Sequence, residues 1–343
     1  MEKFRIAKDS VDPSKVPQRK LSSGDFMPGI GIGTFGSDSV SDVEVAKGVK
    51  EALTIGFRLL DCAACYGNEK LIGDVISDAL DSGEIKRHEL FIASKVWNDM
   101  HGSGDVPLAC EKTLKDLRLD YLDMYFVHWP FPNYHPPGCD SDARNPDSVP
   151  YIHENFMETW RQMESLVKSG LVRNIGVSNV TIPKLNLILP DAHIKPTCNE
   201  MELHPHFQQQ ELFDFCVDND IQPVGFSPIG SPARPERDKV SDDTVATEDP
   251  VIIELARKYN VHPAIICIRW ALQRGQIPIP FSVKRDKLLA NIRCVIDMTL
   301  TEDEMAAIAK IDKNCRLIKG QVFLWEHAKG WEDLWDLDGV IAK

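Results

Sequence analysis

The run FRLLD, residues 57–61, is an apolar, strand-like segment that ends on an aspartate, and three later runs are built in the same way. FIASK ends at Lys95, MYFVH ends at His128 and NIGVS ends at Ser178. The carboxyl ends of parallel strands meet at one edge of a sheet, and a (β/α)8 barrel carries its active site there. The four runs therefore predict parallel strands with polar chemistry at one end of a barrel.

Outward from these runs, apolar segments alternate with amphipathic ones along the chain. The stretch at residues 41–54 has apolar residues at helical spacing, and a hairpin is expected around residues 20–29. Strands that are apolar on both faces and alternate regularly with helices are typical of a covered parallel sheet in an α/β protein. The eight expected strands are 30–33, 57–61, 91–95, 124–128, 174–178, 197–201, 223–227 and 278–282.

The expected organisation is a single (β/α)8 TIM barrel domain over residues 1–343, because no stretch has the composition of an interdomain linker. Residues 1–19 form an N-terminal extension. Residues 316–343 form a C-terminal tail with three tryptophans, which is expected to fold over the barrel mouth as an anchor or as a substrate contact. Irregular stretches at 130–150 and 230–249 follow strand ends, where long loops shape substrate sites.

Composition agrees with a soluble enzyme of one large domain that stays in the cytoplasm. With 43% hydrophobic and 27% charged residues, the chain can bury a sizeable core, and no apolar run reaches the roughly 20 residues that span a bilayer. The charged N-terminus lacks the apolar segment of a signal peptide. Nine scattered cysteines suit a reducing compartment. A net charge of -13 argues against binding to nucleic acid or to an anionic membrane.

A glycine motif at residues 31–36, Gly-x-Gly-x-x-Gly, favours a different fold, because it matches the dinucleotide fingerprint of Rossmann domains with Asp61 at the distance of a ribose-binding acid. Pro28 interrupts the long first strand that this fold requires, and the next helix starts only near Ser41. The same strand–helix unit also continues eight times. The barrel is therefore preferred, and the glycines are expected to let the first strand-end loop approach a ligand closely.

The polar strand ends predict a proton-transfer site. Asp61 and Lys95 end neighbouring strands and are expected to pair as opposite charges. Tyr66 follows Asp61 by five residues, and an ammonium beside its phenol would lower the pKa of that phenol. Tyr66 would then exchange a proton with a substrate oxygen near neutral pH, and His128 would donate to the same oxygen.

Two histidines and two cysteines resemble metal-ligand pairs. Cys62 and Cys65 have C-x-x-C spacing but lack a second pair, and His204 and His206 lack a third ligand at metal-binding spacing. No metal is therefore expected. A basic group in the loop at residues 230–249 is expected to form a solvated loop face, with a substrate or cofactor clamp as the alternative; its members are Arg234, Arg237 and Lys239.

Seven segments with distinctive strand-end sequences extend the pattern along the chain. They are GIGTFG at 31–36, LLDCAACYGNE at 59–69, FIASKVWN at 91–98, YLDMYFVHWP at 121–130, GLVRNIGVSN at 170–179, NEMELHP at 199–205 and GFSPIGSP at 225–232. In this order they resemble the aldo-keto reductase superfamily, nearest to its aldose and xylose reductase-like branch, from about residue 20 to about residue 313. The resemblance implies a barrel and carbonyl reduction by a nicotinamide cofactor bound across its mouth.

The resemblance also implies roles for individual residues. Tyr66 would be the general acid, Lys95 would tune it, Asp61 would pair with Lys95, and His128 would orient the carbonyl. Pocket walls are expected at Phe35, Trp97 and Trp129. The implied cofactor contacts are Thr34, Ser178, Asn179, Glu200, Phe226, Ser227, Ile229, Ser231, Ser282, Lys284, Arg285, Lys287 and Asn291.

Three departures from the family pattern bear on the cofactor. Glu200 stands where relatives often have glutamine, and its charge would be felt by an oxidised nicotinamide. Phe226 replaces a frequent tyrosine and keeps an aromatic face. Phe281 stands where many relatives have a lysine, although Lys284, Lys287 and their neighbours still offer positive charge to a 2′-phosphate. NADPH is therefore the expected cofactor, with NADH or dual use left open.

Aromatic residues beside polar groups suit a sugar, so an open-chain aldose reduced to a polyol is the first choice of substrate. A uronic acid or a small non-sugar aldehyde is the alternative. Two other classes stay open: a non-catalytic, cofactor-sensing subunit of the same superfamily, and a different barrel enzyme such as a metal-dependent hydrolase or a phosphate-binding isomerase. The sequence makes no prediction of oligomeric state.

Overall fold

The strands of the protein form a closed parallel barrel. The computed structural model describes residues 3–131, 148–232 and 234–342. Strands β3 to β10 pair in chain order, each parallel to the next. The Gly31 amide donates to the Pro278 carbonyl at 3.1 Å, so the first strand also joins the last. The strands are β3 Ile32–Gly33, β4 Leu59–Asp61, β5 Phe91–Val96, β6 Leu122–Val127, β7 Val172–Ser178, β8 Cys198–Glu202, β9 Gln222–Phe226 and β10 Ile277–Ile279.

This topology confirms the predicted (β/α)8 barrel and excludes the open sheet of a Rossmann domain. Each strand overlaps the range predicted for it, but β10 ends at Ile279, whereas the sequence predicted a strand that ran to residue 282. Pro280, which directly follows β10, explains this end, because proline has no amide hydrogen to donate.

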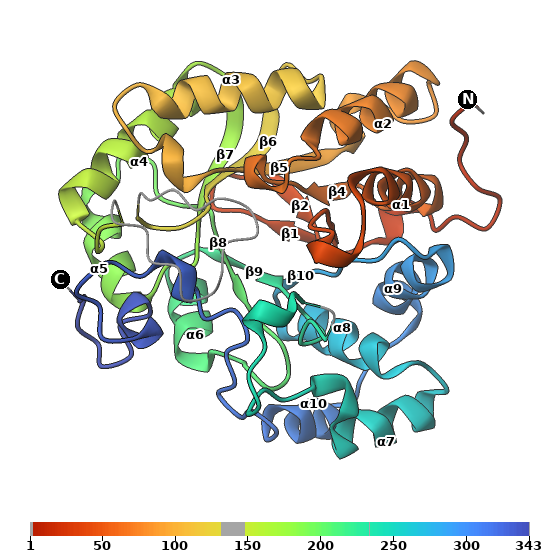
Figure 1. The fold of residues 1–343 in the computed structure, drawn as a ribbon. Coiled ribbons are helices and arrows are strands. Elements are labelled where there is room, and N and C mark those ends of the chain that lie inside the picture. The colour runs from red at the N-terminus through yellow and green to blue at the C-terminus, as the bar shows by residue number, and fades with distance from the viewer. Residues whose placement is uncertain (1–2, 132–147, 233, 343) are drawn as a thin grey trace.

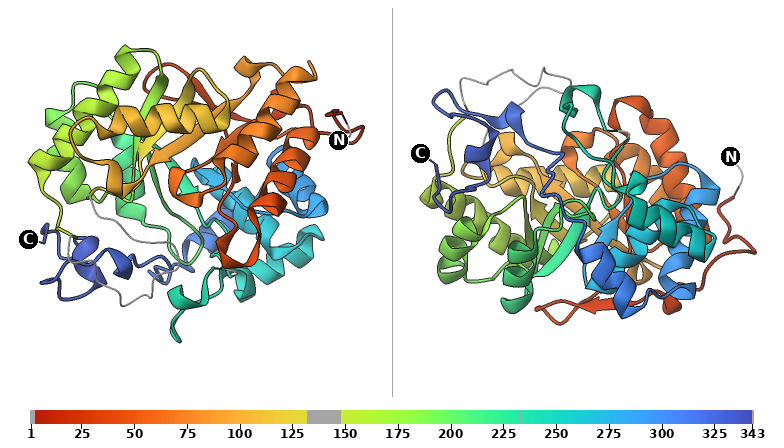
Figure 2. Two further views of the ribbon diagram at one scale, coloured as in Figure 1. Left: turned by 45° about the horizontal axis from the view of Figure 1, so that its top comes forward. Right: turned by 90° about the horizontal axis from the view of Figure 1, so that it is seen from below.

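Helices surround the strands on all sides (Figures 1 and 2). The predicted helix at 41–54 is α1, which begins after Ser41, and a capping box between Ser41 and Glu44 satisfies its first amides. The helices are α1 Asp42–Ile55, α2 Glu69–Asp81, α3 Asp105–Leu117, α4 His153–Lys168, α5 Ile182–Asp191, α6 Gln210–Asp218, α7 Pro250–Tyr259, α8 Pro263–Arg274, α9 Arg285–Asp297 and α10 Glu302–Ala309.

The predicted hairpin closes the end of the barrel where the strands begin. Its strands are β1 Gln18–Lys20 and β2 Phe26–Pro28, paired antiparallel. Leu21 and Met27 of the hairpin join the buried apolar cluster that fills the barrel interior. Because the interior is plugged from this side, a ligand site within the barrel has to open at the other end.

The C-terminal tail lies at that other end, opposite the hairpin (Figure 2, right). Glu202 at the end of β8 accepts hydrogen bonds from the Leu317 and Ile318 amides at 2.8 and 2.9 Å. The Arg316 guanidinium lies 3.4 Å from the centre of the Trp335 ring. The tail therefore folds over the barrel mouth as predicted, and Trp335 helps to anchor it.

The structure describes the two predicted long loops to different extents. Most of the stretch at 130–150 lies outside the described residues. In the stretch at 230–249, Asp243 pairs with Arg234 and, at 3.2 Å, with Lys319 of the tail, so this loop and the tail are tied together. None of the described helices is long and apolar enough to cross a membrane.

Candidate active site

The four residues predicted to carry the chemistry come together at the C-terminal end of the barrel. Asp61 is the last residue of β4 and Lys95 lies near the end of β5. His128 directly follows β6, and Tyr66 ends a short 3-10 turn that begins at Ala64. Parallel pairing of the three strands puts their ends at the same edge, which is why residues 67 positions apart converge.

Lys95 is the centre of the site. Its side chain is fully buried, and Nζ donates to Asp61 Oδ1 at 2.6 Å and to the Cys62 carbonyl at 3.1 Å. Glu200 Oε1 lies 3.3 Å from the same nitrogen. Burial opposes the charge on Lys95, but Asp61 and Glu200 outweigh it and raise the pKa of the ammonium well above its usual value. Lys95 therefore remains positively charged.

Two carboxyl groups share this one ammonium. Burial raises the pKa of Asp61, although Lys95 opposes the shift. Burial and the charge of Asp61 raise the pKa of Glu200 to about 8, again against Lys95. Like charges this close cannot both ionise easily, so the pair retains a proton near neutral pH. The sequence predicted Glu200 as a cofactor contact but not as a partner of Lys95.

Tyr66 lies against this charged group. The Lys95 ammonium is 5.4 Å from the centre of the Tyr66 ring. Burial raises the pKa of the phenol well above 10, and the charge of Lys95 opposes this only in part. The sequence-based expectation of a lowered pKa was therefore wrong, because Asp61 and Glu200 offset the positive charge and the surrounding protein penalises a phenolate. Tyr66 is a neutral phenol that keeps its proton.

His128 is buried beside Tyr66, with 5.9 Å between the two ring centres. Burial and the nearby Lys95 lower the pKa of the imidazole well below its usual value, so it is neutral. The Cys65 sulfur lies 3.6 Å from His128 Nδ1, and the Asn179 amide donates to the His128 carbonyl at 3.0 Å. Sequence reasoning missed the contact between Cys65 and His128, since Cys65 attracted attention only through its C-x-x-C spacing.

The three aromatic residues predicted as pocket walls differ in their exposure and in their contacts. Phe35 is 46% exposed and packs on Tyr66 with 5.2 Å between ring centres. Trp97 packs edge-on against His128 at 5.0 Å and against Phe323 of the tail at 5.8 Å. Trp129 is only 5% exposed and is enclosed by the tail, with Phe323 at 4.5 Å. Phe323 was missed by sequence reasoning because it comes from a segment with no strand-end motif.

Several predicted cofactor residues follow strand ends in a strained conformation. Asn179 after β7, and Ser227 and Ser231 after β9, have φ of 59°, 52° and 34°. Left-handed backbone is unfavourable for residues other than glycine and is concentrated at ligand sites. Ser231 Oγ donates to Ser227 Oγ at 2.7 Å. Within the described residues, the buried atoms Asn179 Oδ1 and Glu200 Oε2 have no hydrogen-bond partner. The mouth thus presents polar groups that a ligand can satisfy.

The remaining predicted cofactor residues line the same mouth or follow β10. Thr34 is buried, and its hydroxyl donates to the Asp61 carbonyl at 2.8 Å. Arg285 donates to Asp9 at 2.5 Å and lies 3.6 Å from Glu51, so its charge is already balanced. Phe226 ends β9, and Ile229 packs against the core. The other four follow β10: Ser282 lies in the loop, Lys284 and Lys287 are exposed, and Asn291 is buried in α9.

The glycines of the first strand end serve packing. A Cβ on Gly31 would lie 2.7 Å from Ile279 Cδ1 and from Leu59 Cγ, and one on Gly36 would lie 2.6 Å from the Val40 carbonyl. Packing within the protein therefore requires glycine at these two positions, and the expectation that the loop approaches a ligand closely stays a prediction.

The residues that resembled metal ligands and a basic clamp have structural partners. His204 pairs with Glu202 at 2.9 Å, and His206 pairs with Asp249 at 3.0 Å. Arg234 is buried rather than solvated, contrary to expectation, because it pairs with Asp243. Lys239 pairs with Glu236, and the side chain of Arg237 is outside what the structure describes. Across residues 3–131, 148–232 and 234–342, no group of three or more metal-ligating side chains is assembled.

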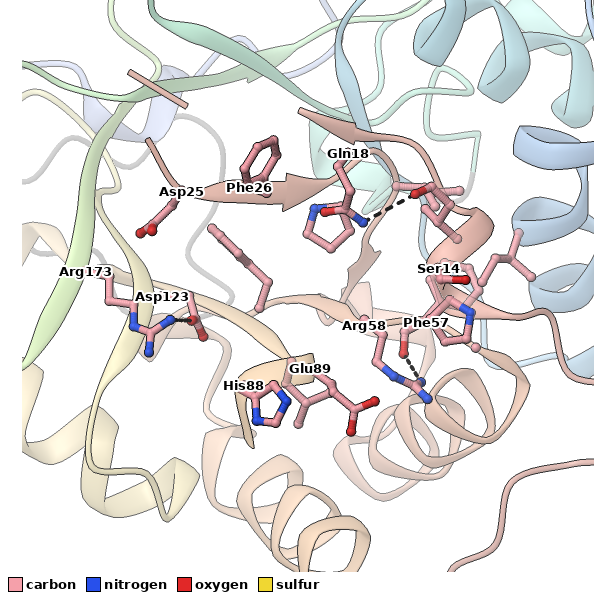
Figure 3. Close-up of a pocket in the computed structure, with 18 residues that line it drawn as sticks. Ser14, Gln18, Asp25, Phe26, Phe57, Arg58, His88, Glu89, Asp123 and Arg173 are labelled. Carbon is pink, nitrogen blue, oxygen red and sulfur yellow. Dashed lines mark hydrogen bonds and ion pairs between the residues drawn. The ribbon is translucent and has the colours of Figure 1, made fainter. Parts of the chain in front are cut away.

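A cavity of about 470 Å³ lies at the opposite end of the barrel, beneath the hairpin (Figure 3). Asp123 near the start of β6 accepts from the Ile92 amide at 2.9 Å, and Arg87 and Arg173 lie 2.7 and 3.7 Å from its carboxylate. Arg58 donates to the Leu53 and Phe57 carbonyls. The charge of Asp123 is already balanced by Arg87 and Arg173, and the residues predicted to carry the chemistry lie at the other end.

Comparison with known proteins agrees with this site. The Aldo/keto reductase family matches residues 29–313. An aldo/keto reductase of Synechocystis sp. is 39% identical over 92% of this chain and 95% of its own length. Aldo-keto reductase family 1 member A1 of Xenopus tropicalis is 40% identical over 88% of this chain and 91% of its own. The crystal structure of a Bombyx mori aldo-keto reductase in complex with NADP superposes with a TM-score of 0.79 at 32% identity, over 90% of this chain and 96% of that one.

The barrel and these matches define an oxidoreductase built on a (β/α)8 barrel. More particularly, the chain belongs to the aldo/keto reductase family.

Proposed function

We propose that this protein uses NADPH to reduce an aldehyde or ketone, most favourably the open-chain carbonyl of an aldose, with Tyr66 as the general acid. The observation that carries the proposal is the neutral phenol of Tyr66 beside the buried, charged Lys95 and the neutral imidazole of His128. An oxygen that gains a proton in the reaction needs a nearby donor, and these residues offer one donor to give the proton and a second to hold the oxygen.

The residues at the mouth fit a nicotinamide cofactor. Buried polar atoms without partners among the described residues, Asn179 Oδ1 and Glu200 Oε2, suit a carboxamide, and Phe226 offers an aromatic face. When bound, the cofactor supplies the hydride. The relative from Bombyx mori is described in complex with NADP, which supports NADPH. Lys284 and Lys287 remain available for a 2′-phosphate, whereas Arg285 is balanced by Asp9 and Glu51.

Tyr66 is suited to give a proton because it keeps that proton until the substrate oxygen becomes basic. Burial raises the pKa of the phenol, which prevents its loss to water at neutral pH. When the carbonyl oxygen gains negative charge, the proton moves from Tyr66 Oη to that oxygen. The phenolate that remains faces the Lys95 ammonium, and this attraction lowers the barrier to transfer.

An aldose is favoured by the surroundings of this donor pair. Phe35 and Trp97 offer aromatic faces that C–H groups of a sugar can contact, while Tyr66 and His128 provide polar partners for oxygen. Lys95 is the positive charge that acts on the Tyr66 phenol, and Asp61 and Glu200 already hold it, so a uronate gains less from it than a free cation would offer.

The test is steady-state oxidation of NADPH and of NADH with a panel of aldoses, uronates and simple aldehydes, for the wild type and for Tyr66→Phe. We expect turnover of aldoses by the wild type and a loss of roughly 10²–10⁴-fold in Tyr66→Phe, the range for removal of a general acid. Tyr121→Phe is the matched control, because its ring stacks on Arg87 and Arg173 at the far end of the barrel. Absence of turnover with every carbonyl, or equal turnover in Tyr66→Phe, would contradict the proposal.

A further inference from the structure

Glu200 combines two properties that a simple hydrogen-bonding residue does not need. Its side chain is only 2% exposed, yet Oε2 has no hydrogen-bond partner in the described ranges. Its other oxygen, Oε1, lies 3.3 Å from Lys95 Nζ. A buried polar atom without a partner is costly, so the free oxygen indicates a group that acts when a ligand is present.

The groups that face Glu200 make its ionisation depend on pH. Asp61 faces it from β4, Lys95 from β5 and the Tyr66 phenol from the turn after β4; Cys198 lies on its own strand. The strands beside it contribute uncharged residues, since Glu200 is in register with Ser178 of β7 and Val224 of β9. One ammonium cannot balance two carboxylates in a buried site, so a proton is retained at neutral pH and is lost on alkaline titration.

The position of Glu200 connects this proton to the cofactor. It lies beside Ser178 and Asn179 at the mouth, where the Asn179 amide donates to the Glu200 carbonyl at 2.9 Å. Asn179 and Glu200 are the residues assigned to the nicotinamide carboxamide in the proposed function. The oxidised nicotinamide ring carries a positive charge and the reduced ring carries none, so a nearby carboxylate attracts only the oxidised ring.

We propose that Glu200 makes the preference of this site for the oxidised or the reduced cofactor depend on pH. Protonated Glu200 is neutral and holds its proton toward Asp61, so it favours neither form of the cofactor. Ionised Glu200 stabilises the positive ring of NADP⁺, so alkaline conditions slow release of the oxidised product and favour the oxidation of alcohols. The inference rests on the proposed function, because it requires the nicotinamide to bind at this mouth.

The test measures binding rather than turnover. Fluorescence titrations with NADP⁺ and with NADPH give the two dissociation constants from pH 6.5 to 9.5 for the wild type and for Glu200→Gln, which keeps the shape of the side chain and removes the titration. The adenosine 2′-phosphate is common to both forms, so its own titration cancels in their ratio. We expect the wild-type ratio to shift towards NADP⁺ by roughly tenfold, the effect of one pKa unit, and to stay level in Glu200→Gln.

Glu69→Gln is the matched control. Glu69 is another buried glutamate whose pKa burial raises, but it accepts from Ser94 and Thr113 on the outer side of the barrel. We expect it to keep the wild-type shift. A level ratio in the wild type, or an equal shift in Glu200→Gln, overturns the inference while cofactor binding itself still supports the proposed function. Failure of both nucleotides to bind any variant overturns both proposals.

Discussion

At the end of the barrel where the strands begin, one carboxylate lies between two arginines; at the other end, one lysine lies between two carboxyl groups. Asp123 accepts from a backbone amide and from Arg87, with Arg173 close by. Lys95 donates to Asp61 and has Glu200 at 3.3 Å, and one oxygen of Glu200 has no partner among the described residues. The first cluster is satisfied by donors in fixed positions, whereas the second holds an exchangeable proton.

Left-handed backbone at residues other than glycine occurs at both ends of the barrel, but in different places. At the hairpin end it is found at Arg118, which directly follows α3, and at Asp220, which follows α6. Non-glycine residues with left-handed φ follow β7 and β9 at the mouth, at Asn179, Ser227 and Ser231. At the hairpin end, Leu21 and Met27 fill the barrel interior with ordinary apolar packing. A left-handed residue where a helix ends is a common way to stop the helix, whereas the left-handed residues that follow strands lie where a barrel binds its ligands.

The sharpest way to break this comparison is to remove one cation at each end. We expect Lys95→Met to lower turnover by roughly 10²–10⁴-fold, because the phenolate left by proton transfer loses the charge that stabilises it. Arg87→Met removes a cation from the Asp123 cluster instead and is expected to leave turnover within about threefold of the wild type. Steady-state kinetics, with circular dichroism to confirm folding, compare the two. Near-normal turnover in Lys95→Met would refute its assigned role.

The complementary change removes the carboxylate at the hairpin end. Asp123→Ala leaves the Ile92 amide without its acceptor and Arg87 without its closest charge. We expect the free energy of unfolding to fall by about 2–3 kcal/mol, with turnover of the folded enzyme unchanged. Urea unfolding monitored by tryptophan fluorescence measures the change. A loss of turnover without a loss of stability would reverse the roles that we assign to the two ends.

The fold was predictable because its signals are local and repeat. Eight apolar runs, the alternation with helices and the capping box at Ser41 each depend on a few neighbouring residues. The prediction of β10 ran too far because Pro280 has no amide hydrogen with which to continue the ladder. Closure of the barrel through Gly31 and Pro278 confirmed the choice against the Rossmann fold.

The site was predictable only in its parts. Strand-end position and family resemblance identified the residues, but the contact of Glu200 with Lys95 crosses the barrel between strands that are not neighbours. Arg285 pairs with Asp9, which lies 276 positions earlier in the chain. The shift predicted for the pKa of Tyr66 had the wrong direction. A sequence can indicate which charge is near the phenol, but not how far burial excludes water and penalises the phenolate. Such contacts depend on side-chain reach and burial.

The smallest effect that we expect concerns the contact that orients the ring of His128. Burial raises the pKa of Cys65 to about 12, so its sulfur carries a hydrogen, and it lies 3.6 Å from His128 Nδ1. A thiol that donates to Nδ1 keeps the ring proton on Nε2, where it is free to donate to a substrate oxygen.

Cys65→Val removes that donor and keeps a side chain of similar size, whereas Cys65→Ser keeps a donor. Because a single weak hydrogen bond contributes less than about 1 kcal/mol, we expect kcat/KM to fall by only about two- to fivefold in Cys65→Val and to stay near the wild-type value in Cys65→Ser. Kinetics over a pH series measure both variants. Equal kcat/KM in the two variants would mean that packing alone orients His128, and the mouth would then resemble the hairpin end in this one respect.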